Sequence, residues 1–591
     1  MSQDTDEFVR VADLEPLQAD GRTLVNKDGQ AIALFYHEGE VRAVDNRCPH
    51  MGFPLTEGSV DDGILTCHWH HARFELSCGD TFDPWADDLP TYPVDIRDGE
   101  VFVIPRHRRD QPPAEHWRDR LQTGLQENLR LVLAKSAIGL TDAGVPYPDA
   151  FTDGLEFGTR YRAAGWSSGL TIHTALANIA PQLTADDRRR ALYVGLDRVA
   201  GDASDQPPKF DQPELRTEEV DADRLKSWFR ETIEVRDADG AERCLRTAIA
   251  NLDQDAIAEI LCTAATDHIY LNTGHTFDFI NKAMEALDIA GWEHAETVLP
   301  SLVPGLAEAD RGEERSQWRQ PIDLASLLFD TYEELPDHVA AGEDQTWSEP
   351  DQFLETVLGD DPHDIVDALV AAVRDGATPA ELAQVVTYAA AVRIARFGTA
   401  NEFGDWDTVH HTYTYANAVH QAARRTDAWE LYRGVFDAAL NVYLDRFLNM
   451  PPAPIPDGDP DADPDDRLAA LEDAFDEEGH VDAAGRAAAD YLAAGGDPDR
   501  LVETLGHGLL REDAGFHTIQ NVEVAVRQRD LATEPDRARV FFIAAARYLA
   551  AHTPTRREAE QTFTIADRLH RGERIHEAGD TGETDVAPGD D

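Results

Sequence analysis

Four side chains that commonly bind metal occur in two short, paired motifs near the beginning of the sequence. Cys48 and His50 form a C-x-H pair, and Cys67 and His70 form a C-x2-H pair after sixteen intervening residues. Two thiolates and two imidazoles that arrive in pairs from two loops suit one [2Fe–2S] cluster whose irons are inequivalent. We expect Cys48 and Cys67 to hold one iron, and His50 and His70 the other.

Short β-like runs surround both motifs. Turn sequences such as Lys27-Asp28-Gly29 and Arg97-Asp98-Gly99 separate these β-like runs from one another. This alternation predicts an all-β domain. The clearest predicted strands are residues 23–25, 31–36, 41–44 and 101–104.

This β-rich region resembles bacterial Rieske ferredoxins. The resemblance rests on CHWHHARFEL at residues 67–76, on Gly79 and on LPTYPV at residues 89–94. It implies a Rieske domain over residues 1–107, with Cys48, His50, Cys67 and His70 as cofactor-binding residues. Neither cluster loop carries the extra Cys that forms a disulfide in respiratory Rieske proteins. The resemblance therefore implies a cluster of the ferredoxin or oxygenase type, at the lower end of the Rieske potential range.

Two alternatives remain for these motifs. The same four side chains would also suit a zinc ion, although zinc sites more often use C-x2-C pairs. His71 adjoins His70 and would change the second motif to C-x3-H. We take His70 as the ligand because it keeps the spacing of the family.

The rest of the chain has the pattern of helices. A charged connector is expected over residues 108–128, and apolar residues at three-to-four spacing then predict an all-α domain over residues 129–573. An acidic, disordered tail is expected over residues 574–591. The predicted fold class is therefore multidomain, with an N-terminal all-β Rieske domain followed by a large all-α, repeat-like domain. The D/E-x2-H-x4-H iron motif of ring-hydroxylating oxygenases is missing, so their α/β catalytic domain is not expected.

A His-Thr pair recurs four times in the helical region, at His173, His275, His411 and His517. Each pair lies on a helical stretch that is followed by a polar break and a second apolar helix, which predicts four diverged helix pairs. If the pairs pack around a common axis, the four imidazoles meet and offer neutral nitrogen donors to a divalent metal. The alternative is that each is an ordinary histidine of the core or of a helix surface.

Lys282 is a fifth candidate ligand. A helix predicted over residues 267–287 places His268, His275 and Lys282 on one face. A buried Lys282 could lose its proton, or be carbamylated to give an oxygen ligand; alternatively, its stem packs on the core and its ammonium reaches solvent. Asp407 lies one turn before His410 and His411, where it could orient an imidazole.

The helical region resembles the questin oxidase-like family, whose members carry out oxidative ring cleavage in aromatic polyketide metabolism. The resemblance rests on residues 165–181, 266–287 and 503–521. It implies an oxygenase that needs neither flavin nor haem. In agreement, the sequence has no G-x-G-x-x-G after a strand and no C-x-x-C-H.

The charge of the chain limits its partners and its location. Asp and Glu number 113 against 53 Lys and Arg, and the net charge of −60 repels nucleic acid and anionic lipid. No apolar run approaches the ~20 residues of a membrane helix, and no signal peptide is visible, so we expect a cytoplasmic protein. Only five basic residues are Lys and 48 are Arg. An acidic, lysine-poor surface favours the salt-rich cytoplasm of a halophile.

Together these features predict an iron–sulfur oxidoreductase. The [2Fe–2S] domain would pass electrons to a His-ligated mononuclear non-haem iron that activates O2 on a small organic substrate, an aromatic one included. A separate NAD(P)H-dependent reductase would supply the electrons, because no dinucleotide-binding unit is found. In the alternative, the chain is a ferredoxin-type electron carrier whose helical domain docks a partner enzyme and holds no metal. The sequence assigns no catalytic residue beyond these ligands.

Overall fold

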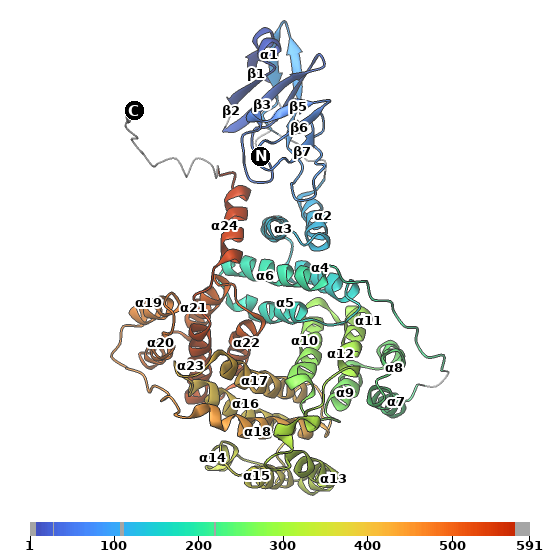
Figure 1. The fold of residues 1–591 in the computed structure, drawn as a ribbon, viewed down its shortest axis with the longest axis vertical. Helices are drawn as coiled ribbons and strands as arrows, with labels where there is room; N and C mark the ends of the chain where they lie inside the picture. Colours follow the sequence, from blue (N-terminus) through green and yellow to red (C-terminus); the bar gives the residue numbers. More distant parts are fainter. Residues whose placement is uncertain (1–6, 28, 107–110, 218–219, 574–591) are drawn as a thin grey trace, which may run out of the picture. The chain divides into compact units, whose positions relative to one another are not determined.

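The computed structural model describes residues 7–27, 29–106, 111–217 and 220–573 (Figure 1). Two compact units are found: one lies within Met1–Pro146 and Gln561–Asp591, and the other is Tyr147–Glu560. The expected disordered tail, 574–591, lies outside the described residues, and so do residues 107–110 around the predicted domain boundary.

Ten strands and the short helix α1 (Leu14–Asp20) form the β domain of the first unit. All strand pairs are antiparallel, in sheets of order β1-β10-β9, β2-β3-β4-β8 and β5-β6-β7. The strands are β1 (Val9–Asp13), β2 (Arg22–Lys27), β3 (Gln30–His37), β4 (Glu40–Asp45), β5 (Ser59–Asp61), β6 (Ile64–Thr66), β7 (Arg73–Glu75), β8 (Thr91–Tyr92), β9 (Val94–Arg97) and β10 (Glu100–Val103). The predicted N-terminal β domain is confirmed.

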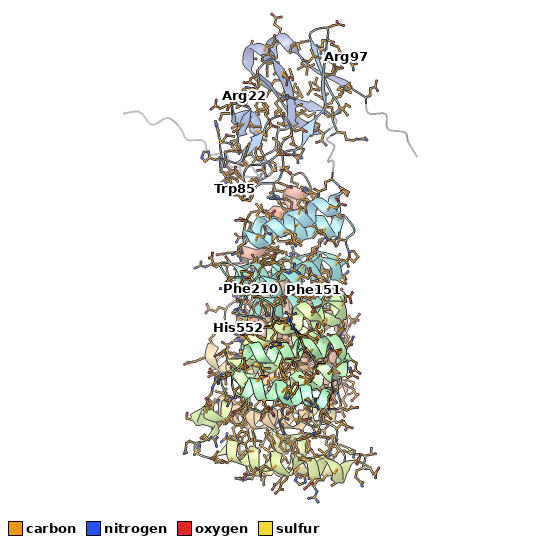
Figure 2. All side chains as sticks on the ribbon, turned by 90° about the vertical axis from the view of Figure 1, so that its right-hand side faces the viewer. Arg22, Trp85, Arg97, Phe151, Phe210 and His552 are labelled. Carbon is orange, nitrogen blue, oxygen red and sulfur yellow. The ribbon has the colours of Figure 1, made fainter. Side chains whose placement is uncertain are left out.

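The core of the β domain extends to the loops that carry the paired motifs. Cys48 and Cys67 belong to one apolar cluster with Leu55, Leu65 and Phe74. Trp85 packs against this cluster, and Arg97 lies toward the opposite end of the domain (Figure 2). The paired motifs are therefore anchored in packed β structure.

Gly79 occupies a position that only glycine fits. Its φ is +86°, and a Cβ there would lie 1.9 Å from the carbonyl oxygen of Leu89. The backbone amide of Leu89 donates a hydrogen bond to the carbonyl oxygen of Gly79. Gly79 thus allows the loop after β7 to pack closely on the segment before β8.

Helices complete the first unit. They are α2 (Pro113–Gln126), α3 (Arg130–Asp142) and most of α24 (Glu558–His570). The expected connector at residues 108–128 therefore contains a helix, which Pro113 begins in the position where a missing backbone N–H costs least.

The second unit is all-helical in its described residues, as predicted. Its helices are α4 (Tyr147–Arg160), α5 (Ser168–Ile179), α6 (Ala185–Ala203), α7 (Ala222–Glu234), α8 (Ala238–Asn251), α9 (Gln254–Ala265), α10 (His275–Ala290), α11 (Ala295–Val298), α12 (Val303–Ala307), α13 (Leu324–Gly342), α14 (Phe353–Val357), α15 (Pro362–Arg374), α16 (Pro379–Ala395), α17 (Phe403–Ala423), α18 (Leu431–Leu444), α19 (Pro464–Phe475), α20 (Val481–Ala493), α21 (Pro498–Leu510), α22 (Phe516–Leu531), α23 (Pro535–Ala551) and the beginning of α24. None of the helices found in the described ranges is long and apolar enough to span a membrane.

The four helices that carry the His-Thr pairs lie at the centre of this unit (Figure 1). Helix α5 packs on α10, α10 on α17, α17 on α22, and α22 on α5, which closes a ring. Helices α6, α9, α16, α18 and α23 cover its outside. These four helices are therefore packed against other helices on several sides, and polar side chains on them are held in packed surroundings.

The prediction of one continuous helix over residues 267–287 is wrong. Helix α9 ends at Ala265 and α10 begins at His275, with a short 3-10 turn, Leu271–Gly274, between them. Tyr270, Asn272 and Thr273 have positive φ angles of 47°, 50° and 56°, which no continuous helix contains. His268 therefore does not share a helix face with His275, and its imidazole instead contacts Glu234 and Glu313.

Candidate functional site

The four ligands predicted for the iron–sulfur cluster lie on two neighbouring loops of the β domain. Cys48 and His50 follow β4, whereas Cys67 and His70 lie between β6 and β7. The two cysteines are buried, at 3% and 1% exposure. His50 is half-buried and His70 is exposed.

The two thiols lie close together, and backbone amides point at both sulfur atoms. Cys48 and Cys67 share a hydrogen bond, which raises the pKa of Cys48 and lowers that of Cys67 to about 6. Backbone amides of His50 and Met51 donate to Cys48 Sγ, and those of Trp69 and His70 donate to Cys67 Sγ. Amides aimed at sulfur favour thiolates, the form that binds iron.

The two imidazoles also converge. The ring centroids of His50 and His70 are 4.9 Å apart, and Trp85 lies 4.8 Å from His50. Burial, and then the charge of Lys135, lower the pKa of His50 to about 4 and keep it neutral. Its buried Nδ1 has no hydrogen-bond partner among the described residues. His71 is exposed and has a positive φ of 63°, and the 4.9 Å ring contact makes His70 the imidazole that lies beside His50. Two thiols, two imidazoles and a buried nitrogen without a partner fit a [2Fe–2S] cluster.

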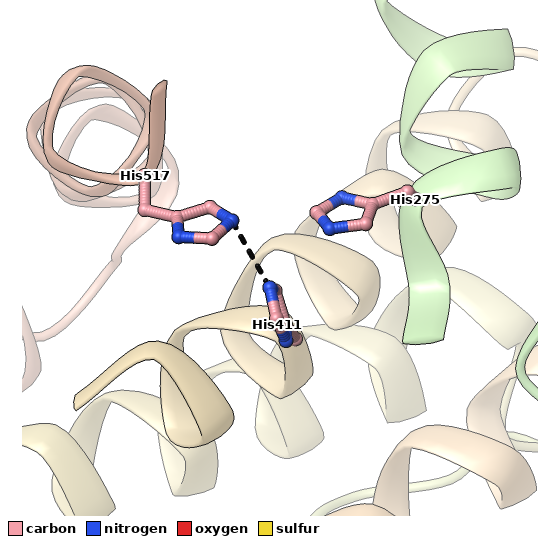
Figure 3. A group of neighbouring side chains, drawn as sticks. All are labelled: His275, His411 and His517. Carbon is pink, nitrogen blue, oxygen red and sulfur yellow. Dashed lines mark hydrogen bonds between the residues drawn. The ribbon is translucent and has the colours of Figure 1, made fainter. Parts of the chain in front are cut away.

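A second group of possible metal ligands lies among the central helices of the second unit. His275, His411 and His517 each offer a ring nitrogen, and these three atoms lie within 4.8 Å of one another (Figure 3). We call these residues the histidine triad. They come from α10, α17 and α22, three of the four helices that the sequence singled out. Their convergence makes a metal site possible.

The Nε2 atoms of His411 and His517 lie 3.0 Å apart. Two nitrogens that bind one metal ion at about 2.1 Å and at right angles are separated by about 3.0 Å, so this spacing suits two neighbouring ligands. The ring centroid of His275 lies 4.6 Å from that of His411 and 5.7 Å from that of His517. His275 therefore offers a third imidazole close to the other two.

The strained turn before α10 holds His275 in place. Asn272 donates its backbone N–H to the carbonyl oxygen of Asp310, and Asp310 returns a backbone N–H to the Asn272 side chain. The backbone amide of Tyr270 donates to Asp437. Consecutive left-handed residues cost free energy, and such strain clusters at functional sites. The turn delivers His275 as the first residue of α10.

The carboxylate of Asp407 holds the imidazole of His517. His517 Nδ1 donates to Asp407 Oδ1 at 3.0 Å, and the Tyr548 hydroxyl donates to the same oxygen at 3.2 Å. Burial raises the pKa of Asp407, but the hydrogen bond and charge of His517 outweigh it and keep the carboxylate ionised. An ionised carboxylate only accepts, so Nδ1 of His517 carries a proton, and Nε2 is the ring nitrogen that faces His411 and would supply the lone pair for a metal ion. The sequence predicted that Asp407 would orient a histidine of its own helix, whereas it reaches across to α22.

The surroundings of His275 and His411 favour the neutral form of these two imidazoles. Burial lowers the pKa of His275 to about 4 and that of His411 to about 3, and neighbouring imidazoles add to both shifts. Neutral imidazole is the form that binds a metal ion. The rings of Phe516 and Phe279 lie 5.4 Å and 5.9 Å from His275. These two aromatic side chains, which sequence reasoning missed, form an apolar wall beside the site.

His173, the fourth predicted ligand, does not join the triad. It is fully buried on α5, where its Nε2 lies 2.9 Å from the carbonyl oxygen of Phe151 and its ring stacks on the Phe151 ring. A Cβ at Gly195 would lie 2.3 Å from its Nδ1, and one at Gly154 would lie 2.8 Å from its Nε2. Backbone is therefore packed against both ring nitrogens, which leaves no space there for a metal ion.

Lys282 lies in a buried ion-pair network. Its Nζ donates to Glu285 at 2.8 Å and to both carboxylate oxygens of Glu523 at 2.9 Å. Arg527 lies 3.2 Å from Glu285, so two cations balance two carboxylates. Burial lowers the pKa of Lys282, but the charges of Glu285 and Glu523 raise it above its ordinary value. Lys282 is therefore a buried ammonium paired with carboxylates. Both interpretations from the sequence, a metal ligand and a side chain whose ammonium reaches solvent, are wrong.

The N-terminal domain is similar to known electron carriers. The Rieske [2Fe-2S] domain model matches residues 7–93. The 3-phenylpropionate/cinnamic acid dioxygenase ferredoxin subunit of Photorhabdus laumondii is 40% identical over 74 residues, which are 12% of this chain and 70% of that protein. The ferredoxin component of the naphthalene 1,2-dioxygenase/salicylate 5-hydroxylase systems of Ralstonia sp is 30% identical over 100 residues, 17% of this chain and 96% of that protein.

A solved structure gives a similar match. The ferredoxin of carbazole 1,9a-dioxygenase from Nocardioides aromaticivorans IC177 is 26% identical and covers 17% of this chain and 98% of its own, with a TM-score of 0.16. The Rieske match agrees with the paired thiols and imidazoles and indicates a [2Fe–2S] cluster. Through this N-terminal domain, the chain belongs to the Rieske [2Fe-2S] family.

Proposed function

We propose that this protein is an oxidoreductase in which electrons from the Rieske domain serve an iron ion at the histidine triad, and that this iron activates O2 against a small organic substrate. The observation that carries the proposal is the convergence of three imidazoles from three helices, one of them held by Asp407. When bound, the cluster supplies one electron at a time.

The electron donor argues for a redox-active metal at the triad, and O2 activation argues for iron. Three neutral imidazoles suit zinc, copper and iron alike. Zinc has no redox chemistry, so a zinc ion at the triad could not accept electrons from the cluster on the same chain. Iron with histidine ligands and open positions is the usual choice for O2 activation, and the resemblance to the questin oxidase-like family agrees with an oxygenase that lacks flavin and haem.

The surrounding residues have separate roles in this proposal. Asp407 fixes the tautomer of His517, and the turn at Tyr270–Gly274 fixes where His275 lies. Phe279 and Phe516 exclude water from one side of the triad and provide an apolar surface for an organic substrate. Their aromatic rings are compatible with a substrate that is itself aromatic.

The relatives support an oxygenase system as the setting. Their names describe ferredoxin components of dioxygenase and hydroxylase systems. By analogy, we propose that this Rieske domain receives electrons from a separate NAD(P)H-dependent reductase. It differs from a separate ferredoxin in sharing its chain with the triad.

Mixing the reduced protein with O2 tests the proposal. Full-length protein is reduced anaerobically, and the oxidation of the cluster is followed by its visible absorbance after O2 is added. With His275→Ala, oxidation should slow by about tenfold or more, equivalent to about 1.4 kcal/mol or more of activation free energy. The matched control is His363→Ala, which replaces an exposed histidine on α15 of the same unit and should keep the wild-type rate.

Equal rates in all three proteins would contradict the proposal. They would favour the alternative function, in which the chain is an electron carrier and the helical unit docks a partner enzyme.

A further inference from the structure

Three helices of the first unit lie against the loop that carries Cys48 and His50. Leu569 of α24 approaches Gly52, where a Cβ would lie 3.4 Å from its Cδ2, and Arg47 Nη1 donates to the carbonyl oxygen of Gly572 at 2.6 Å. A cavity of about 260 Å³ lies between loop and helices, lined by Cys48, Pro49, Trp117, Lys135 and His570 among others. Helices α2, α3 and α24 lie outside residues 7–93, which the Rieske domain model matches.

Lys135 is the charged residue that α3 presents to this loop. The side chain is 9% exposed, and its Nζ donates to the carbonyl oxygen of Pro49 at 2.5 Å and to that of His50 at 2.9 Å. Both acceptors belong to the three-residue segment Cys48-Pro49-His50, which supplies one thiolate and one imidazole. Two hydrogen bonds therefore hold the Lys135 ammonium against the backbone segment that carries two of the four predicted cluster ligands.

The other charged groups near Lys135 do not cancel the effect of its positive charge on the loop that carries Cys48 and His50. Burial lowers the pKa of Lys135 to about 8, and the nearby charge of Asp87 opposes this shift, so the ammonium form still prevails at neutral pH. Arg120 Nε lies 3.3 Å from Asp87, and His116 Nε2 also lies 3.3 Å from it. Asp87 is therefore largely balanced by Arg120. Burial of the Lys135 ammonium also protects its field from screening by salt.

We propose that Lys135 is a positioning residue that raises the reduction potential of the Rieske cluster. Reduction adds one electron, taken from the reductase or from dithionite, and so adds one negative charge beside a fixed positive one. The ammonium stabilises the reduced form more than the oxidised form, and hydrogen bonds and charge near the ligands are known determinants of cluster potential. The inference rests on the cluster alone, so its failure can be distinguished from failure of the proposed oxygenase.

Redox titration of the full-length protein with dithionite, at one fixed pH near neutrality, tests the proposal. The fraction of reduced cluster is followed by electron paramagnetic resonance. With Lys135→Met, the equilibrium constant for reduction should fall about tenfold, which is a shift of about −59 mV for a one-electron couple. Lys135→Gln, whose amide can still donate to a carbonyl oxygen, should shift the potential in the same direction, because it too lacks the charge.

Two further variants complete the test. Lys135→Arg keeps the charge and should retain most of the wild-type potential. Arg97→Met removes one positive charge from the other end of the β domain (Figure 2) and should leave the potential unchanged. Wild-type potentials in both neutral Lys135 variants would overturn the proposal. Loss of the cluster from both would also overturn it, because Lys135 would then serve assembly and not potential.

Discussion

Replacing His411 with alanine should leave about two iron atoms per chain where the wild type, loaded with iron anaerobically, holds about three, because the cluster keeps its two irons. The visible and circular dichroism spectra of the cluster should not change, since its four ligands lie in the other unit. His411 is a direct test of the triad because its Nε2 lies 3.0 Å from that of His517 and its ring lies beside that of His275. Iron analysis after removal of loosely bound metal measures the result.

A graded variant distinguishes a metal ligand from a structural histidine. Asp407→Asn keeps a side chain of the same size but weakens the hold on His517 Nδ1, and should lower metal affinity by about 10- to 100-fold without abolishing binding. Tyr548→Phe removes the other partner of the same oxygen and should have a smaller effect. Three irons per chain in His411→Ala would contradict the assignment of the triad.

Replacing Lys282 with methionine should lower the free energy of unfolding by about 3–5 kcal/mol. Two buried carboxylates, Glu285 and Glu523, would then share the single cation Arg527, and an uncompensated charge would remain in the core. Urea denaturation followed by far-ultraviolet circular dichroism measures the change, as a lower midpoint with an unchanged slope.

Two controls accompany the Lys282 variant. Arg500→Met breaks an exposed ion pair with Asp465 and should barely change the midpoint, because exposed pairs contribute little. The triple variant Lys282→Met, Glu285→Gln and Glu523→Gln removes the charge imbalance and should recover part of the loss. A wild-type midpoint for Lys282→Met alone would show that the network does not stabilise the second unit.

The convergence of the four predicted cluster ligands could be foreseen from the sequence because their spacing is local. Cys48 and His50 share one loop and Cys67 and His70 share another, so the motif is complete within 23 residues. In the structure, His70 and not His71 has its ring beside that of His50, in agreement with the predicted spacing. Lys135, by contrast, carries no motif; only the packing of α3 on the loop brings it to the cluster domain.

The triad was predictable in part. The repeated His-Thr pair identified His275, His411 and His517 although 136 and 106 residues separate them, because equivalent places in a helical repeat can face one axis. His173 shares the pair, but Gly154 and Gly195 bring backbone against its ring, and such close approaches leave no sign in helical periodicity. The break at Tyr270–Gly274 escaped notice because only Gly274 is a typical helix-breaking residue there.

Counting the electrons that one chain accepts tests the central claim most directly. Fully oxidised, iron-loaded, full-length protein is titrated anaerobically with dithionite, with the cluster followed by its absorbance and the total uptake by the amount of dithionite consumed. The account predicts about two electrons per chain, one for the cluster and one for iron at the triad, and about one electron for His411→Ala. Uptake of one electron by wild-type protein with a full cluster would contradict the account and leave the Rieske cluster as its single redox centre.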